Sequence, residues 1–224
     1  MRIETYPDFE MMAINVAQRI CGDLKAALDS QDRVLLAVPG GTTPGPIFDD
    51  LCAADLDWSR VDIILTDERW VPGDHERSNT KLLKERLLVN RAADATLLPL
   101  YVATDEPEEG LPQLIPGIEA RLPIAVAVLG MGADMHTASL FPDSAELDAA
   151  LAHNAPALIP VRPESQPEAR ITLAAHVLNG ALHKHVVFKG QDKRDALDKA
   201  MTLPPQDAPI RAVLDGATVH YSEN

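Results

Sequence analysis

The sequence predicts an α/β fold in which helices cover both faces of a mostly parallel sheet, in a single domain over residues 1–224. Short, continuous apolar runs, typical of strands buried on both faces, alternate with helical segments. The chemically distinctive motifs follow the ends of these runs, where sheets of this kind bind their ligands. A chain of 224 residues is also long enough for one sizeable core.

The first element is a helix over residues 8–30, because apolar residues recur there at three- and four-residue spacing. A second helix is expected over residues 79–88. Four apolar runs predict buried strands: Arg33–Val38, Val61–Leu65, Ile124–Leu129 and Val186–Phe188.

The remaining segments are interpreted from their turn residues. Two proline-rich stretches, Glu106–Pro116 and Ile159–Pro167, are expected to be surface loops. The segment Val213–Tyr221 contains Asp215-Gly216, a dipeptide typical of tight turns, and predicts a hairpin at a sheet edge.

Composition and charge exclude several classes of partner. The first residues lack the apolar core of a signal peptide and no run approaches the ~20 residues of a membrane span, so we expect a cytoplasmic protein without a membrane partner. Cys21 and Cys52 have no metal-ligand spacing and are expected to be inert, reduced thiols. The net charge of −14 argues against nucleic acid, and it requires any anionic substrate to meet a local cluster of donors.

A glycine-rich turn follows the strand that ends at Val38. Gly40 and Gly41 allow close backbone approach, and Thr43-Pro44 is interpreted as the N-cap and first residue of a helix. Free N–H groups at that helix start, with the hydroxyls of Thr42 and Thr43, would bind an anion. The alternative is a turn that binds nothing. The Lys-Ser/Thr ending of a nucleotide P-loop is missing, which argues against ATP.

Three consecutive charged residues, Asp67, Glu68 and Arg69, follow the next strand. Charges at a strand end are costly to bury unless they are paired in a site. The pattern alone leaves a solvated loop and a binding site equally open.

The most specific segment is Val128–Asp143. After a buried strand come Gly130 and Gly132, then Asp134 and His136 two residues apart. An imidazole can take a proton from water and return it to a leaving oxygen, and Asp134 can fix its tautomer. A structural loop histidine is the alternative. A dinucleotide-binding turn is less favoured, because Met135 replaces the third glycine of G-x-G-x-x-G.

The other histidines lack such a setting and are expected at the surface: His75, His153, His176, His183, His185 and His220. Positive charge comes later in the chain, from Arg170 and from Lys193 in the first turn of an expected helix. Both suit a phosphate, although surface solvation is the alternative for each, above all for the lysine.

Together these motifs resemble the 6-phosphogluconolactonase family in order and spacing, over nearly the whole chain. The matching segments are Val38–Pro44, Thr66–Arg69 followed by Ser78-Asn79, Gly130–Pro142, Arg170–Leu173 and Gly190–Lys193. The resemblance implies a Rossmann-like sheet and hydrolysis of a phosphorylated sugar lactone, whose product would enter the pentose phosphate or Entner–Doudoroff pathway. It implies that His136 activates water and that Asp67 and Arg69 line the site. It further implies that Gly40, Gly41, Thr42, Arg170 and Lys193 hold the substrate or its phosphate, with neither cofactor nor metal.

One residue departs from the family pattern. The family usually has glycine between the aspartate and the histidine, where this chain has Met135. A side chain with a Cβ resists positive φ, so either this position never required a positive φ or the loop differs slightly here. The first alternative predicts an ordinary negative φ at Met135, with a small loss of stability and no gain of activity in Met135→Gly.

Three rival functions are less well supported. Glucosamine-6-phosphate deaminases typically continue with Asn-Glu-Pro after the histidine segment, whereas this chain has Leu140–Asp143. Non-catalytic sugar-phosphate sensors of similar fold carry a DNA-binding segment and often lose the histidine. A nucleotide-dependent oxidoreductase would need the glycine fingerprint that Met135 interrupts.

Overall fold

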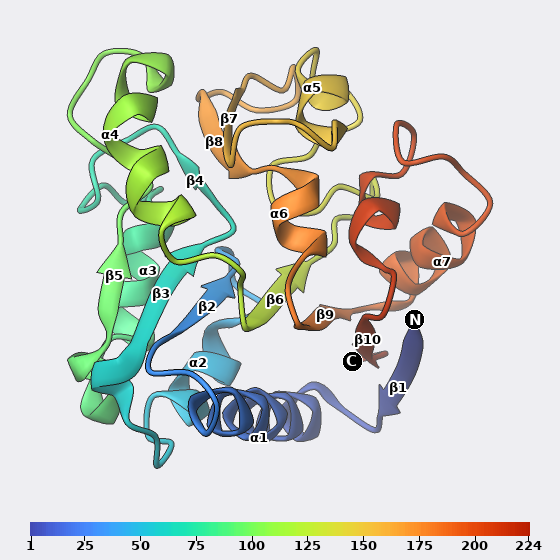
Figure 1. The fold of residues 1–224 in the computed structure, drawn as a ribbon. Coiled ribbons are helices and arrows are strands. Elements are labelled where there is room, and N and C mark those ends of the chain that lie inside the picture. The colour runs from blue at the N-terminus through green and yellow to red at the C-terminus, as the bar shows by residue number, and fades with distance from the viewer.

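The computed structural model describes residues Met1–Asn224 and contains two sheets. The large sheet has seven strands, all parallel, and Figure 1 shows it crossing the middle of the molecule. Its strands, in spatial order, are β1 (Arg2–Tyr6), β10 (Thr218–Ser222), β9 (His183–Lys189), β6 (Val126–Gly130), β2 (Val34–Val38), β3 (Val61–Leu65) and β5 (Thr96–Leu98). The small antiparallel sheet consists of β4 (Asp67–Arg69), β8 (Arg170–Leu173) and β7 (Leu158–Val161).

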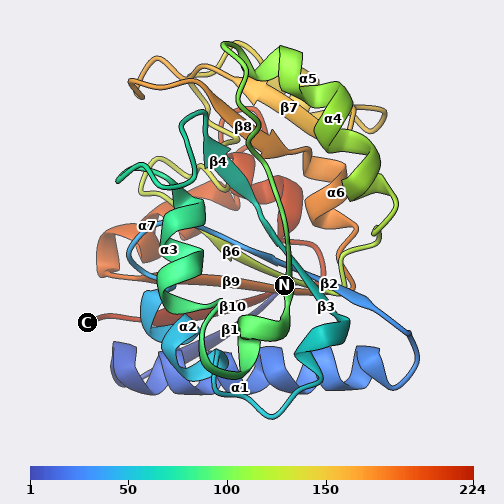
Figure 2. The same cartoon turned by 90° about the vertical axis from the view of Figure 1, so that its left-hand side faces the viewer.

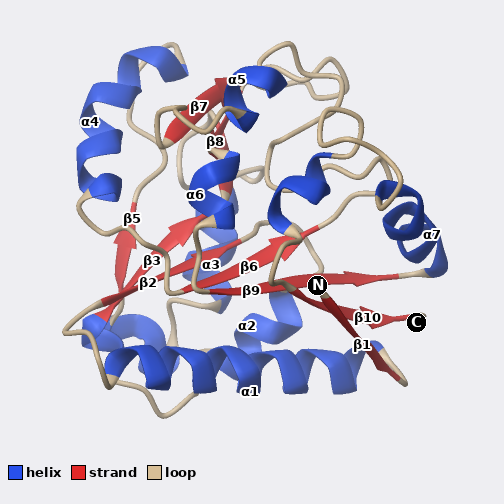
Figure 3. Ribbon diagram, turned by 45° about the vertical axis from the view of Figure 1, so that its right-hand side comes forward, coloured by secondary structure: helices blue, strands red, loops and turns tan.

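Helices cover both faces of the large sheet, as the sequence predicts. Figures 1, 2 and 3 show α1 (Phe9–Leu28) and α2 (Gly45–Leu51) beneath the sheet. The same views show α6 (Ala175–Asn179), α4 (Pro107–Glu119), α5 (Leu147–Leu151) and the small sheet above it. The other helices are α3 (Asn79–Arg86), α7 (Gln191–Ala200) and three 3₁₀ turns at Trp58–Arg60, Asn90–Asp94 and Pro209–Val213.

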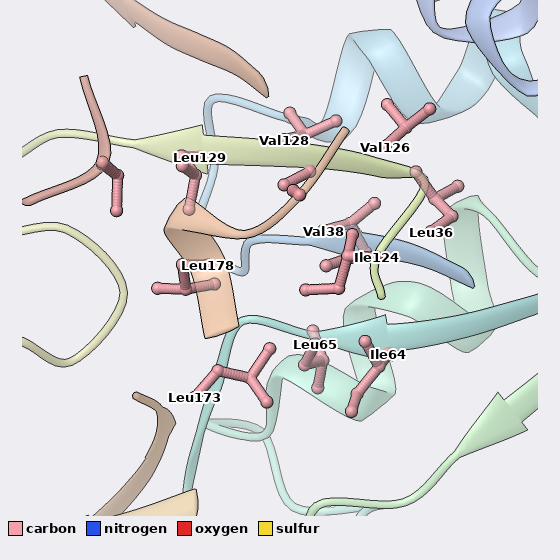
Figure 4. Close-up of a cluster of buried hydrophobic side chains, with 14 of the residues drawn as sticks. Leu36, Val38, Ile64, Leu65, Ile124, Val126, Val128, Leu129, Leu173 and Leu178 are labelled. Atoms are coloured by element: carbon pink, nitrogen blue, oxygen red, sulfur yellow. The ribbon is translucent and has the colours of Figure 1, made fainter. Parts of the chain in front are cut away.

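The central strands form the core because they are apolar on both faces. Every residue of β2 and β3 is buried, including Asp62, which pairs with Arg33 and Arg121. Figure 4 shows side chains of β2, β3 and β6 gathered with Leu173 of β8 and Leu178 of α6. The helices and the small sheet therefore share one continuous apolar core with the large sheet.

The main predicted elements are confirmed, with boundaries shifted by a few residues. Helix α1 starts where Asp8 accepts a hydrogen bond from the N–H of Met11, so Asp8 is its N-cap. Strand β3 coincides with the predicted run, and β9 extends the predicted Val186–Phe188 at both ends.

Residues 107–119 form helix α4, so the prediction of a surface loop there is wrong. Gly110, Leu114 and Ile118 are buried at four-residue spacing and give the helix an apolar face. Pro112 and Pro116 lie on its exposed side, where water can satisfy the carbonyls that lose their partners. The loop predicted over residues 159–167 also needs correction, since it begins inside β7.

The predicted C-terminal hairpin is wrong as well. Gly216 does form a turn, with φ = +67°, but this turn connects a 3₁₀ helix to β10. Strand β10 then pairs in parallel with β1 on one side and β9 on the other. The Asp-Gly signal identified the turn but carried no information about the partner strands.

Two histidines expected at the surface are buried. His220 is fully buried and His185 nearly so, because each imidazole has hydrogen-bond partners on both sides. Both cysteines are free thiols, with Cys52 buried and Cys21 partly buried. None of the helices has the length and apolar character needed to cross a membrane.

Candidate active site

A cavity of about 360 Å³ opens where the carboxyl ends of β2, β3 and β6 meet the small sheet. Nine of the ten catalytic and binding residues predicted from the sequence line it: Gly40, Gly41, Thr42, Thr43, Asp67, Arg69, His136, Arg170 and Lys193. Asp134 does not line the cavity and lies beside His136. Parallel topology explains this convergence, because the carboxyl ends of neighbouring strands reach the same edge of the sheet.

The glycine-rich turn forms one wall of the cavity. Gly41 has φ = +87°, a conformation that favours glycine, and a Cβ at Gly40 would collide with the Asn79 side chain. The following helix, α2, begins at Gly45 with Pro44 as its N-cap and no side-chain cap. The prediction that Thr43 caps this helix is therefore wrong, and the Thr43 hydroxyl is not used by the helix start.

His136 and Asp134 form a hydrogen-bonded pair. The imidazole Nδ1 lies 2.6 Å from Asp134 Oδ1, and the same oxygen accepts a longer bond from the His136 backbone N–H at 3.3 Å. Burial is the largest influence on the pKa of the Asp134 carboxyl and acts to raise it, but the hydrogen bonds that the carboxylate accepts and the charge of His136 together outweigh burial, so the pKa is lowered. Because the ionised carboxylate only accepts hydrogen bonds, Nδ1 carries the proton and Nε2 keeps its lone pair.

The loop around this pair has an unusual backbone. Met135 has φ = +67° and Ala138 has φ = +50°, so the prediction of a negative φ at Met135 is wrong. Met135 is nearly buried and its carbonyl accepts a hydrogen bond from Ile210, so packing holds the residue in a region that costs roughly 1–2 kcal/mol. A Cβ at Gly132 would collide with Asp134 Oδ1 and His136 Nδ1, so the pair requires glycine there.

Asp67 and Arg170 are a buried ion pair on the neighbouring strands β4 and β8. Arg170 Nη1 lies 3.3 Å from Asp67 Oδ2, which also accepts a 2.5 Å hydrogen bond from the Ser139 hydroxyl. Burial lowers the pKa of Arg170, partly opposed by the charge of Asp67. Arg170 Nη2 donates to Gln166 Oε1 at 3.0 Å, so the guanidinium is held on two sides.

Glu68 and Asn79 fix the position of Arg69. Arg69 Nη1 donates to Asn79 Oδ1 at 2.7 Å, while the Asn79 amide donates to the Asp67 carbonyl at 3.0 Å. Glu68 is fully buried and accepts from the Ser78 hydroxyl and from the backbone N–H groups of residues 69, 79 and 80. It therefore ties the start of α3 to β4.

Lys193 is the one lining cation without a partner in the protein. It lies in the first turn of α7, after Gly190 with φ = +96°, and no carboxylate is within ion-pair distance of its ammonium. A half-buried cation opening into a cavity is suited to an anionic ligand.

Several residues of the site were missed from the sequence. Ser139, Gln166 and Phe141 touch the functional side chains, and only their place near the histidine or arginine motifs could have indicated them. No group of three or more His, Cys, Asp or Glu side chains is arranged to hold a metal ion.

Comparison with known proteins gives consistent matches. Residues 7–221 match the family described as glucosamine-6-phosphate isomerases/6-phosphogluconolactonase. A 6-phosphogluconolactonase of Pseudomonas aeruginosa is 38% identical over 213 residues, covering 93% of this chain and 90% of that protein. The crystal structure of a 6-phosphogluconolactonase from Shewanella baltica superposes with a TM-score of 0.95 at 33% identity, over 99% of this chain and 97% of that one. A monomeric glucosamine-6-phosphate deaminase shares the fold, with a TM-score of 0.81 at 14% identity, over 99% and 97% of the two chains.

Proposed function

Since this chain belongs to the family of glucosamine-6-phosphate isomerases and 6-phosphogluconolactonases, we propose that it hydrolyses the ring ester of 6-phospho-D-glucono-1,5-lactone to 6-phosphogluconate. Relatives named as lactonases match nearly the whole chain at more than 30% identity, which favours hydrolysis over deamination. The observation that carries the proposal is that His136, hydrogen-bonded to Asp134, lines the same cavity as the unpaired ammonium of Lys193.

His136 is the general base of the proposed reaction. Its Nε2 has no partner in the protein, so it can accept a proton from a water molecule as that water attacks C1 of the lactone. The new C1–O bond forms while the carbonyl oxygen gains negative charge. When the bond between C1 and the ring oxygen breaks, the imidazolium returns the proton to the departing oxygen, which regenerates the base.

Asp134 supports the base in two ways. Its carboxylate holds the proton on Nδ1, which leaves Nε2 free to react, and its charge stabilises the imidazolium formed during attack. A δ-lactone is an activated ester that hydrolyses slowly in water even without an enzyme. One positioned general base is therefore expected to be sufficient, because correct positioning of the reactants supplies much of the remaining acceleration.

The substrate phosphate is assigned to the wall formed by residues 40–43 and Lys193. Backbone N–H groups, the Thr42 and Thr43 hydroxyls and the ammonium can supply charge-assisted hydrogen bonds. Arg69 and Arg170 are assigned to the sugar end of the cavity, where Asp67 holds Arg170 in place.

The proposal also covers the domain organisation, the partners and the cellular compartment of the protein. Residues 1–224 act as one catalytic domain on a small phosphorylated sugar lactone, without nucleic acid or membrane partners. The cytoplasm suits both this substrate and the two free thiols, Cys21 and Cys52.

One pair of assays tests the function. Acid release from freshly prepared 6-phosphogluconolactone is measured beside ammonia release from glucosamine 6-phosphate. Rapid acid release with no ammonia is expected. Ammonia release would identify a deaminase, and the absence of both activities with retained sugar-phosphate binding would identify a sensor.

A further inference from the structure

Phe141 is a buried aromatic residue in the wall of the cavity, 2% exposed. Its ring stacks on the His136 imidazole, with 4.3 Å between the ring centroids and 25° between the ring planes. The Arg170 guanidinium lies over the same ring, with Cζ 5.5 Å from its centroid. Phe141 thus contacts both the proposed base and the buried ion pair of the site.

The imidazole has few other restraints. The His136 side chain is 31% exposed, and its ring makes one hydrogen bond, from Nδ1 to Asp134. A single hydrogen bond fixes the direction of one nitrogen but lets the ring turn about that bond. A stacked ring on one face limits this rotation, and such contacts are worth roughly 0.5–1.5 kcal/mol.

Resting on the proposed function, we propose that Phe141 is a positioning residue for His136. Its ring keeps the imidazole plane aligned so that Nδ1 stays on Asp134 while Nε2 stays directed at the substrate carbonyl. The effect falls on the chemical step rather than on substrate binding, because Phe141 offers the phosphate no hydrogen-bonding group.

Two substitutions at this position test the idea. Phe141→Leu keeps an apolar side chain but removes the ring face, and it should lower kcat by about three- to tenfold with KM nearly unchanged. Phe141→Tyr keeps the ring, and its kcat should be close to that of the wild type. Phe188→Leu is the matched control: Phe188 is fully buried, and it faces away from the cavity because its neighbour Val187 lines it. This control should leave kcat unchanged.

An NMR measurement tests the positioning role of Phe141 independently of the proposed reaction. In ¹⁵N NMR of histidine-labelled protein, His136 should show the Nδ1–H tautomer in the wild type and in Phe141→Tyr, and a mixture of tautomers in Phe141→Leu. An unchanged tautomer in Phe141→Leu overturns the positioning role, whatever the enzyme hydrolyses. Equal changes in kcat and KM also overturn it.

A chain of hydrogen bonds outside the cavity carries a second inference, independent of the reaction. Asp23 of α1 accepts from His185 Nε2 at 2.8 Å, and His185 Nδ1 lies 3.0 Å from His220 Nε2. His220 Nδ1 lies 2.9 Å from the Tyr6 hydroxyl, which donates to Glu4 at 2.9 Å. The chain thus joins α1, β9, β10 and the edge strand β1.

If all three side chains between the two carboxylates are neutral, they carry one proton fewer than the hydrogen bonds require. The four hydrogen bonds need four protons, whereas two neutral imidazoles and one phenol supply three. Both ends of the chain are carboxylates, which only accept. Glu4 is ionised in its pairs with Arg2 and Arg19. Burial is the largest influence on the pKa of Asp23 and acts to raise it, but the hydrogen bond to His185 and the charges of His185, His183 and Arg19 together outweigh burial, so the pKa is lowered.

The geometry points to one additional proton bound by this chain at neutral pH, carried by His185. His185 then donates to both Asp23 and His220, and His220 is neutral with its proton on Nδ1, facing Tyr6. Burial, together with the charge of His185, lowers the pKa of His220 to about 3, which agrees with a neutral His220.

The surrounding charges are compatible with a bound proton. His183 of β9 lies 3.7 Å from Asp23, and Arg2 and Arg19 pair with Glu4. With the proton bound, every group in the chain has a partner, so β1 is tied to the sheet by side chains as well as by its ladder with β10. Without the additional proton, one hydrogen bond of the chain is unmade at this edge of the sheet.

Substitution of Tyr6 tests the proton count. Without the phenol, two hydrogen bonds remain between Asp23 and His220, and two neutral imidazoles satisfy both. In ¹⁵N NMR at pH 7.5, His185 should be doubly protonated in the wild type and singly protonated in Tyr6→Phe.

Tyr221→Phe is the control for this substitution. Tyr221 lies on β10 beside His220, but its hydroxyl donates to Gln191, so His185 should be unchanged in this variant. A singly protonated His185 in the wild type at pH 7.5, or an unaltered His185 in Tyr6→Phe, overturns the inference.

Discussion

Arg170 and Asp67 form an ion pair across 3.3 Å in which the side chains are only 7% and 8% exposed. The sequence indicated Arg170 as a ligand for phosphate, but this carboxylate already occupies one side of its guanidinium. The pair therefore helps to shape the cavity. Among the cations of the site, Lys193 is the one free to meet a phosphate directly.

The burial of the pair predicts a large effect on stability. Arg170→Ala leaves the Asp67 carboxylate buried and unpaired, so the free energy of unfolding should fall by about 3–5 kcal/mol. Urea unfolding measures the loss. The double variant Asp67→Asn with Arg170→Ala should recover part of it, because the uncompensated charge is gone. A loss under about 1 kcal/mol in the single variant contradicts the buried pair.

Lys193→Ala tests phosphate recognition without this complication, because Lys193 has no partner to leave unpaired. On 6-phosphogluconolactone, kcat/KM should fall by an amount equivalent to about 2–3 kcal/mol. On unphosphorylated gluconolactone it should change little. Equal losses on both lactones would remove Lys193 from the phosphate site.

His136→Asn tests the base. Asparagine keeps the polarity and approximate size but cannot take up a proton, so kcat should fall by ~10²–10⁴ while KM stays nearly constant. Steady-state rates of acid release decide this, after correction for uncatalysed hydrolysis. Turnover close to that of the wild type would assign the proton transfer to another group.

The positive φ of Met135 predicts that glycine at this position is more stable than alanine, the reverse of the usual order. Met135→Ala and Met135→Gly both lose the buried side chain, but only alanine keeps the Cβ strained by φ = +67°. Met135→Gly should be more stable than Met135→Ala by about 0.5–1 kcal/mol, since the relieved strain exceeds the added freedom of the unfolded chain. Thermal unfolding of both variants gives the comparison. Greater stability of the alanine variant would be inconsistent with a left-handed residue 135.

The buried His220 predicts acid sensitivity. Burial first, then the positive charges nearby, lower its pKa to about 3, against about 6.5 in the unfolded chain. Between these values the unfolded state binds a proton that the folded state does not, so stability falls as pH decreases, by at most about 1.4 kcal/mol per pH unit. Above pH 6.5 this contribution is constant.

Urea unfolding between pH 4 and 7 checks this slope against the variant His220→Gln. The variant should show a shallower pH dependence than the wild type. Identical slopes would mean that other groups cause the acid sensitivity.

The sequence predictions were accurate where neighbouring residues determine the structure and failed where residues far apart in the sequence determine it. The runs that became β2 and β3 were recognisable because strands buried on both faces must be apolar throughout. The residues that line the cavity were recognisable because their motifs follow strand ends. Helix α4 was missed because Pro112 and Pro116 are local breakers, whereas its stability comes from distant packing partners.

The buried histidines were missed for a related reason. His185 and His220 are separated by 35 residues and acquire their partners only when β9 and β10 pair. Nothing local marks either of them as buried. The φ of Met135 was likewise set by packing against residues far along the chain, including Ile210.

The position of β1 bears on how the chain folds as it leaves the ribosome. Strand β1 pairs only with β10, and the contact between Tyr6 and His220 spans 214 positions of sequence. At about 5–20 residues per second, the first strand must wait roughly 10–40 s for its partner to be synthesised. During that interval the other strands can assemble without it. The N-terminal strand is therefore expected to join last, closing a sheet whose central strands are already in place.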